Sequence, residues 1–299
     1  MKERVQEEME MDERECEGME SEDVIPDTSN HGAVTVDEVI DGMGFGQYQV
    51  WLLSLCGAGW AADILDLQVI AYLIPALVKD WQVARAQLGI AASSTFLGML
   101  LGSLFWGVIS DRYGRRPAFM FTSLCAGVFG MAASTSMNVS HLVFWRLLQG
   151  FGLGGNLAVD FSLYMEFVPT NMRGKSSMVL TVFASLGSMS AAALAYMLLD
   201  PLNGTGWRLF LLLAAAPGIA IAALRARMLE SPYFLASRGK LKEAEQVLRA
   251  VADFNGTPLA APISLRQPSL TSTSETLHVL QKLFSAYLLK RVAGMYAYS

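Results

Sequence analysis

The sequence predicts an all-α membrane protein with six membrane-spanning helices, because both its composition and its runs of apolar residues are typical of one. Of the 299 residues, 53% are hydrophobic and only 16% are charged, with a mean hydropathy of +0.37. Soluble domains usually contain about a quarter charged residues. Six apolar segments lie between residues 49 and 228. Each is close to the ~20 residues that a helix needs to cross the ~30 Å hydrocarbon core of a bilayer.

The net charge of −5 is unevenly distributed along the chain. Residues 1–30 hold twelve acidic and three basic residues, a balance of −9, so the rest of the chain carries +4. A segment this charged and this poor in aromatic residues is typical of disorder. We therefore expect residues 1–33 to form a disordered acidic tail.

A short helix is predicted directly after this tail. Thr35 and Glu38 have the spacing of a capping box, in which each side chain bonds the other residue's backbone N–H. The box predicts a helix over roughly 36–43, which glycines at 42, 44 and 46 would end. The six predicted spans then cover 49–78, 88–110, 117–137, 140–164, 176–199 and 207–228.

Beyond the last span the chain becomes polar again. Apolar residues recur at helical spacing over 239–253 and over 275–290. Between them, 255–274 is rich in Pro, Ser and Thr and is expected to be a linker. The predicted domains are the tail (1–33), a six-span membrane domain (34–228) and a cytoplasmic helical segment (229–299).

The distribution of Lys and Arg predicts the orientation of the chain. Eleven of these residues lie in or beyond the loops on one side of the predicted spans, and three lie on the other side. Basic residues gather on the cytoplasmic side of membrane proteins. Both ends are therefore expected in the cytoplasm, in an integral multi-pass protein of the plasma membrane or of an endomembrane vesicle.

The most specific motif lies between the second and third spans. It reads Gly107-Val-Ile-Ser-Asp111-Arg112-Tyr-Gly114-Arg115-Arg116. A glycine permits close approach of helices, the aspartate can cap or pair at the membrane surface, and arginines bind lipid phosphate and neighbouring acids. The spacing resembles the signature loop of the major facilitator superfamily.

Three further motifs lie where that superfamily has them. They are Arg146-x3-Gly150-x-Gly152-x-Gly154, Glu166-x2-Pro169-x3-Arg173-Gly174 and Glu230-Ser231-Pro232. They resemble the sugar and organic-ion branches. The run from Gly154 to Asp160 is most similar to the synaptic-vesicle-protein-related transporters. The family's usual arginine after Glu-Ser-Pro is Tyr233 here, which should weaken one cytoplasmic salt bridge.

This resemblance implies secondary active or facilitative transport of a small organic solute, with or without proton coupling. It implies no enzymatic activity, cofactor or metal, and membrane lipid, solute and protons rather than nucleic acid as partners. The family has twelve spans, with the solute between two six-helix halves. The chain would then need a second half-transporter or a homodimer. The alternative is a truncated or incomplete product that does not transport and acts at most as a partner of a full-length transporter.

Charged residues inside the predicted spans are the first candidates for function. Asp63 and Asp66 are three residues apart and share a helix face, near the middle of the bilayer. Such a pair can exchange a proton or bind an organic cation. Alternatively, one aspartate pairs with Arg146 and only holds the helices together. The predicted substrate and proton pathway comprises Asp63, Asp66, Arg146, Asn156, Gln68 and Tyr72.

Because a second half would cover this pathway, we expect its charges to lie on a face that the chain alone leaves uncovered. A second group of residues is expected to form a gating network of salt bridges at the cytoplasmic surface. In it, Asp111 and Arg112 would pair with Glu166, Arg173 and Glu230. The full predicted network is Gly107, Asp111, Arg112, Gly114, Arg115, Arg116, Asp160, Glu166, Arg173 and Glu230.

The glycines of the fourth predicted span also spell a dinucleotide-binding fingerprint, Gly150-x-Gly152-x2-Gly155. That fingerprint requires a preceding strand. Here it lies within a segment of helical length, so close packing of helices through small residues is the better interpretation. Gly98-x3-Gly102 in the second span has the same interpretation.

Overall fold

The computed structural model describes residues 34–199, 206–259 and 264–267. These residues form helices, joined by short connections, together with an isolated bridge between Val34 and Leu265. The predicted all-α class is confirmed. The predicted tail, 1–33, and the predicted helix 275–290 lie outside the described residues.

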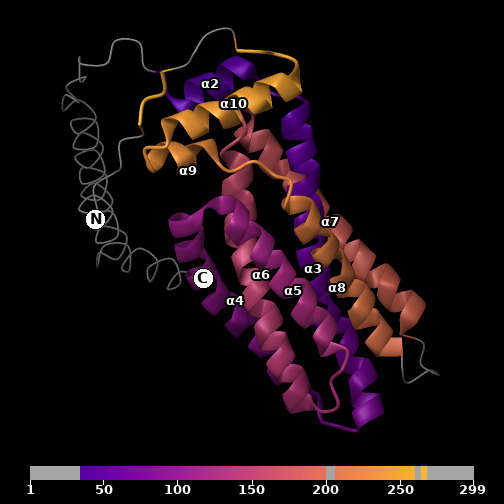
Figure 1. Cartoon of the computed structure of the whole chain (residues 1–299). Coiled ribbons are helices and arrows are strands. Elements are labelled where there is room, and N and C mark those ends of the chain that lie inside the picture. The colour runs from indigo at the N-terminus through magenta and orange to yellow at the C-terminus, as the bar shows by residue number, and fades with distance from the viewer. Residues whose placement is uncertain (1–33, 200–205, 260–263, 268–299) are drawn as a thin grey trace, which may run out of the picture. The chain divides into compact units, whose positions relative to one another are not determined.

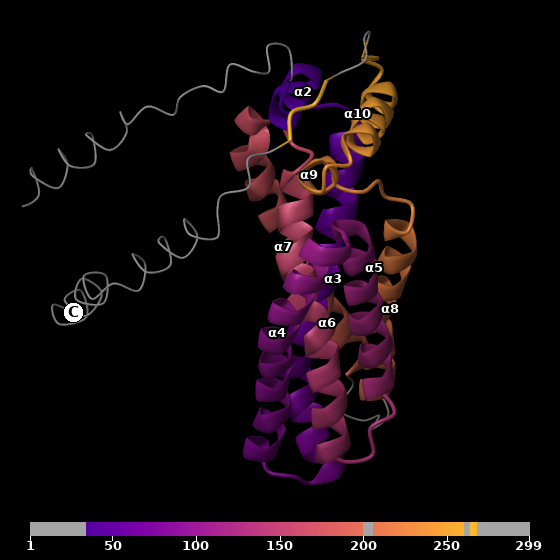
Figure 2. The ribbon, with the colours of Figure 1, turned by 60° about the vertical axis from the view of Figure 1, so that its left-hand side comes forward.

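Six long helices lie side by side in the described part of the chain (Figures 1 and 2). They agree with the predicted spans to within a few residues. Their bounds are α3 Gln47–Trp81, α4 Arg85–Tyr113, α5 Arg115–Ala133, α6 Val139–Met165, α7 Arg173–Leu198 and α8 Gly206–Arg225.

Four of these helices are long and apolar enough to cross a membrane: α3, α4, α7 together with the short η1 (Thr170–Met172), and α8. Helix α5 begins with two arginines, and α6 contains Arg146 and Asp160, which lowers the hydropathy of both. Helix α6 packs against α4 and α5, so part of its surface faces protein rather than lipid. The predicted number of six spans therefore stays a prediction.

Helices α4 and α6 pack closely because glycines remove side chains from both surfaces. A side chain at Gly98 or Gly102 would collide with the α6 backbone. A side chain at Gly150 or Gly154 would collide with the α4 backbone. These glycines lie inside helices, as the packing interpretation of the fourth span requires.

Gly107 does not have the role expected of it. No atom of another described helix lies within 4 Å of a Cβ placed there, so the expected close approach of helices does not occur at Gly107 within this chain. The close approach on α4 occurs earlier in the helix, at Gly98 and Gly102.

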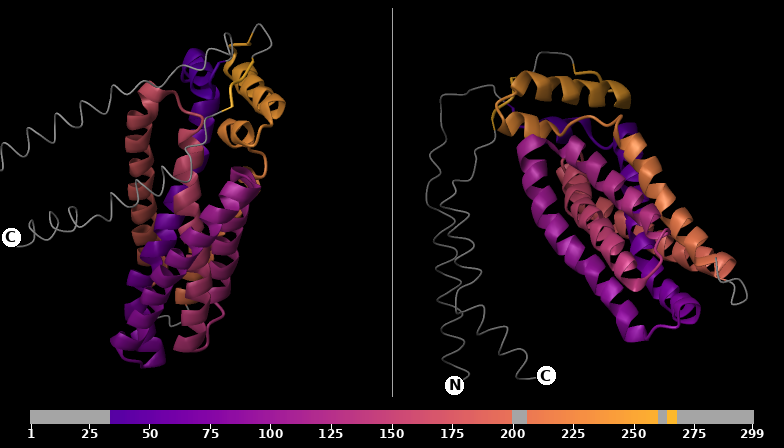
Figure 3. Two further views of the ribbon diagram at one scale, coloured as in Figure 1. Left: turned by 90° about the vertical axis from the view of Figure 1, so that its left-hand side faces the viewer. Right: turned by 60° about the horizontal axis from the view of Figure 1, so that its bottom comes forward.

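Three short helices lie together at one end of the long ones (Figures 1 and 3). We call them the cap: α2 Val36–Met43, α9 Pro232–Ser237 and α10 Leu241–Asn255. The predicted capping box of α2 is present, with Thr35 N–H 2.9 Å from the Glu38 carboxylate. Gly44 follows with a positive φ of 72°. Helix α9 was not predicted, although Ser231 as N-cap and Pro232 in the first turn are typical helix-start residues.

The cap is fixed to the start of α3 by Asn255, the last residue of α10. Its carbonyl oxygen accepts a hydrogen bond from Tyr48 N–H at 2.8 Å, and its amide donates to Gln49 Oε1 at 3.0 Å. Apolar residues from all three cap helices pack with α3 and α6 in one core that includes Ile40, Leu235 and Leu248.

The glycine packing predicts a difference between two substitutions in α4. Gly98→Ala puts a methyl group against the Leu147 carbonyl, and such overpacking usually costs about 1–3 kcal/mol. Gly107→Ala enters open space and should be neutral or slightly stabilising, because alanine favours helix. Thermal unfolding of the detergent-solubilised chain should show a lower midpoint for Gly98→Ala alone. Equal midpoints for the two variants would contradict the packing.

Candidate functional site

Five charged side chains are buried in the described part of the chain. Asp63 and Asp66 come from α3, Arg146 and Asp160 from α6, and Arg225 from α8, and none is more than 4% exposed. Three acids and two arginines give a balance of −1 when all are ionised. Buried charges are costly unless they are paired or hydrogen-bonded, so their contacts determine what the site can do.

Arg225 lies at the centre of these contacts. Its guanidinium pairs with Asp160 at 2.8 Å and donates to the Asn156 carbonyl oxygen at 3.1 Å. It also donates to the Phe119 carbonyl oxygen at 3.2 Å and to the Ser123 hydroxyl, and it stacks on the Phe119 ring, 3.4 Å from the ring centroid. Arg225 therefore joins α8 to α5 and α6.

Asn156 extends this network to α3. Its amide nitrogen donates to Asp63 Oδ1 at 2.9 Å, while its carbonyl oxygen accepts from Arg225 and from the Ser123 hydroxyl. Asp63, Asn156, Arg225 and Asp160 thus form one continuous buried chain of contacts, which we call the buried network. The second oxygen of Asp63 has no hydrogen-bond partner among the described residues.

Sequence reasoning placed Asp63 and Asn156 in one site, and the structure brings them into contact. It missed Arg225, which was counted among the basic residues of the cytoplasmic side although the last predicted span, 207–228, contains it. The buried positions of α8 lie on one helical stripe: Trp207, Phe210, Leu211, Ala214, Ala215, Ile221, Ala222 and Arg225. Arg225 continues this stripe, and that periodicity is the signal that would have found it.

Arg146 and Asp66 form a second, looser group. Arg146 donates to Gln149 Oε1 at 3.0 Å and to the backbone carbonyl oxygen of Asp66 at 3.4 Å. No ion pair joins the Arg146 and Asp66 side chains within the described residues. Two guanidinium nitrogens of Arg146 have no hydrogen-bond partner there. The expected pairing of Arg146 with an aspartate is therefore an electrostatic attraction to the Asp66 carboxylate, and the direct hydrogen bond goes to the Asp66 backbone carbonyl.

The predicted pathway residues differ in their surroundings. Gln68 and Tyr72 are exposed on the surface of α3 and do not share the buried surroundings of the aspartates, and their place in the pathway stays a prediction. Asp63, Asp66 and Arg146 do not lie on an uncovered face, because helices of the same bundle cover them. Helices of this chain therefore shield these charges, and the second half stays a prediction.

The loop between α4 and α5 is organised by Glu230, just before α9. Its carboxylate accepts hydrogen bonds from the backbone N–H groups of Arg115 and Arg116, at 2.8 and 3.1 Å. A negative charge at a helix N-terminus is stabilised by the unpaired N–H groups there. Gly114 has a φ of 117°, and a Cβ at this position would lie 2.6 Å from Glu230. The positive φ favours glycine, and a side chain here would have to displace the Glu230 carboxylate.

Arg115 connects this loop to the end of α6. It pairs with Asp111 at 2.7 Å and with Glu166 at 3.3 Å. Burial raises the pKa of Glu166, and the nearby carboxylates of Glu230 and Asp111 raise it too, against the opposing effect of Arg115. Acidification should therefore protonate Glu166, and weaken its pair with Arg115, at a higher pH than for an ordinary glutamate.

Three residues of the predicted gating network lie elsewhere. Arg112 stacks on Tyr113, 5.9 Å from the ring centroid, and is not part of the Arg115 cluster. Asp160 belongs to the buried network instead of the loop. Arg173 pairs with Asp37 of α2 at 2.6 Å.

Arg173 also donates to the hydroxyl of Tyr233 at 3.3 Å. The resemblance led us to expect an arginine and a salt bridge at position 233, and Tyr233 makes this hydrogen bond there instead.

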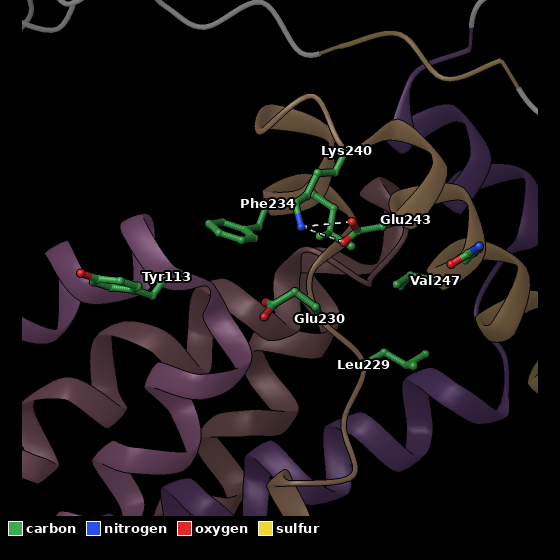
Figure 4. Close-up of a pocket in the computed structure, with 9 residues that line it drawn as sticks. Tyr113, Leu229, Glu230, Phe234, Lys240, Glu243 and Val247 are labelled. Atoms are coloured by element: carbon green, nitrogen blue, oxygen red, sulfur yellow. Dashed lines mark hydrogen bonds and ion pairs between the residues drawn. The ribbon is translucent and has the colours of Figure 1, made fainter.

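A separate cavity of about 470 Å³ lies between the end of α4 and the cap (Figure 4). Its charged residues are already engaged: Lys240 pairs with Glu243 at 3.1 Å, and Glu230 holds the start of α5. This cavity is not part of the buried network, and it offers no unpaired charge to a ligand.

Ionised side chains buried within long apolar helices are typical of proteins that move ions or solutes across membranes. The family described as "Sugar (and other) transporter" matches residues 58–293. The chain belongs to this family, which confirms the resemblance that the motifs indicated. It is an integral, multi-pass membrane protein.

The curated relatives include two whose names state different substrates. Organic cation/carnitine transporter 7 of Arabidopsis thaliana is 34% identical over 225 residues, which cover 75% of this chain and 44% of that protein. Niacin transporter NiaP of Acinetobacter baylyi is 32% identical, covering 76% of this chain and 51% of that one. The synaptic vesicle 2-related protein of Rattus norvegicus is 32% identical, covering 75% and 40%.

Among solved structures, the proton:xylose symporter XylE of the major facilitator superfamily matches with a TM-score of 0.63 and 23% identity. The match covers 68% of this chain and 50% of XylE, and it shows a shared fold. The chain spans about half the length of the curated relatives it matches.

The loop contacts predict that two neighbouring arginines differ in importance. Arg115→Gln leaves Glu166 and Asp111 without their cationic partner and should lower stability by about 1 kcal/mol, as expected for a partly exposed cluster. Arg112→Gln should change stability by less than about 0.5 kcal/mol. Thermal unfolding of the two variants tests this, and a larger effect of Arg112→Gln would contradict the assignment.

Proposed function

We propose that this chain forms one six-helix half of a transporter for a small organic solute, and that Asp63 takes up and releases a proton during transport. The observation that supports this best is the buried network itself. Asp63 is fully inside the bundle, yet its side chain contacts a neutral amide, and one of its oxygens has no partner.

The charge balance supports Asp63 as the group that changes its charge. Asp160 has a direct ion pair with Arg225, and the charge of Arg146 attracts the Asp66 carboxylate. Asp63 is the acid left over from the balance of −1. One proton, or one monovalent organic cation, would neutralise the site. Both remain candidates, because the relatives' names include an organic cation transporter and a niacin transporter.

Transport by this family fold needs a pathway between two bundles. The chain matches about half of its relatives, so the second bundle would come from further polypeptide, a second copy or another chain. Large apolar side chains are exposed on α4 and α7, among them Phe96, Leu104, Met178 and Tyr196. These surfaces would contact lipid or the second bundle. The alternative is a non-transporting partner of a full-length transporter.

We further propose that α3 to α8 all cross the membrane and that the cap is cytoplasmic. The three motif arginines Arg112, Arg115 and Arg116 contact residues in or next to α9 and the end of α8, at the cap end. Arg208 contacts Ser136 in the connection between α5 and α6, at the other end, in agreement with the positive-inside rule. Protection of terminal tags from protease in sealed cells would test this. The plasma membrane and endomembrane vesicles remain the proposed locations.

The proposed role of Asp63 predicts the behaviour of Asp63→Asn. This variant should abolish uptake driven by a pH gradient but keep solute exchange at equal pH, because an amide resembles a protonated acid. Uptake of carnitine, niacin and xylose is measured in proteoliposomes that hold the chain alone or with a second bundle. Asp80→Asn, at the far end of α3, is the matched control and should behave like the unsubstituted chain.

Two other outcomes would contradict this role of Asp63. Loss of both uptake and exchange would show that Asp63 binds a cationic solute. Retention of both would show that it only stabilises the helix bundle.

A further inference from the structure

We infer that Arg225 is a positioning residue: it fixes the orientation of the Asn156 amide and thereby sets the pH at which Asp63 takes up a proton. The inference rests on the proposed function in taking Asp63 as the proton-carrying group. It assigns a role to a residue that none of the sequence motifs includes.

The orientation of the Asn156 amide follows from the chemistry of arginine. A guanidinium has donors and no acceptor. The Asn156 atom that faces Arg225 at 3.1 Å must therefore be the carbonyl oxygen. The amide nitrogen is then directed towards Asp63, where it donates to Oδ1 at 2.9 Å.

The amide orientation matters because the two ends of an amide favour different states of a carboxyl group. An N–H donor stabilises the charged carboxylate, whereas a carbonyl oxygen would accept a hydrogen bond from the protonated acid. Holding the nitrogen towards Asp63 favours the ionised form. Without Arg225, the amide of Asn156 can turn and favour the protonated form instead.

Other charges near Asp63 must be considered with Arg225. Asp66 lies on the same helix, Arg146 and Asp160 face inward from α6, and Arg225 comes from α8. Helices α5 and α7 carry their charged residues only in their first turns. Arg225 also acts directly through its charge, so the test must separate that charge from the orientation of the amide.

Arg225 is well placed to make proton binding depend on the loop between α4 and α5. It is the last residue of α8, and the carbonyl of the next residue, Ala226, accepts a hydrogen bond from Arg116. A movement of the loop that shifts the end of α8 would move the guanidinium relative to Asn156.

Labelling with dicyclohexylcarbodiimide tests the inference without any transport, because this reagent reacts with protonated carboxyls in apolar surroundings. The full 299-residue chain is labelled in detergent across a pH series, and modification of Asp63 is located by fragmentation mass spectrometry. The measured quantity is the pH of half-maximal labelling at Asp63.

Arg225→Lys keeps the positive charge beside Asp160, but a single ammonium group is too short and too narrow to hold Asn156 as well. It should raise the half-labelling pH by about 0.5–1 unit, the effect of one lost hydrogen bond. Asn156→Leu should raise it similarly. In the Asn156→Leu background, Arg225→Lys should add no further shift.

A matched control is Ser123→Ala, which removes a neutral partner of the same Asn156 oxygen but leaves the guanidinium in place. This control should shift the half-labelling pH less than Arg225→Lys does.

If Arg225→Lys does not fold, the double variant Asp160→Asn with Arg225→Gln replaces it, because it removes one positive and one negative charge together. This double variant should raise the half-labelling pH at least as much.

Several results would overturn the inference. One is the absence of Asp63 labelling at every pH, and another is an unchanged half-labelling pH in Arg225→Lys. A third is a shift caused by Arg225→Lys in the Asn156→Leu background that is as large as its shift in the unsubstituted chain. The expected shifts without any pH-driven uptake would support the inference and contradict the proposed function. Uptake driven by a pH gradient without the expected shifts would support the proposed function and contradict the inference.

Discussion

A charge buried among apolar helices needs an opposite charge or hydrogen-bond partners on neighbouring helices. The Asp160–Arg225 ion pair provides them here. Both side chains are almost completely buried, and they lie 2.8 Å apart. Through Arg225 the pair reaches Phe119 on α5, and through Asn156 it reaches Asp63 on α3. Four of the six long helices therefore depend on one guanidinium, and removing either member of such a pair typically costs about 3–5 kcal/mol.

The loop charges and the buried charges form two separate sets, and Asp160, which the sequence placed in the gating group, belongs to the buried one. The loop set, centred on Arg115 and Glu230, is partly exposed and lies at the cap end. The buried network lies inside the bundle and contains the acid that we propose exchanges a proton. They meet at the end of α8, where Arg225 and Ala226 are consecutive residues with one contact in each set. Movement of the loop between α4 and α5 could therefore affect Asp63 through the end of α8.

The sequence predicted the helices well, because apolar runs and the Thr35–Glu38 capping box are local signals. It also predicted that Asp63 and Asn156 share a site, since polar residues deep in apolar segments tend to gather. It failed for residues whose partners come from distant parts of the sequence. Arg225 was counted as a loop residue because it ends an apolar run, although its place in the buried stripe of α8 indicates the interior. The partners of Arg173 lie in the cap, where it pairs with Asp37 of α2 and bonds Tyr233 of α9, a helix that was not predicted.

The central claim is that Asp160 and Arg225 neutralise each other inside the bundle, and thermal unfolding of three variants in detergent tests it most directly. Asp160→Asn and Arg225→Gln each leave one buried charge unpaired, and each should lower the midpoint by about 10 °C. The double variant removes both charges and should be more stable than either single variant. A double variant that loses the sum of the two single effects would contradict the account, because the two residues would then act independently.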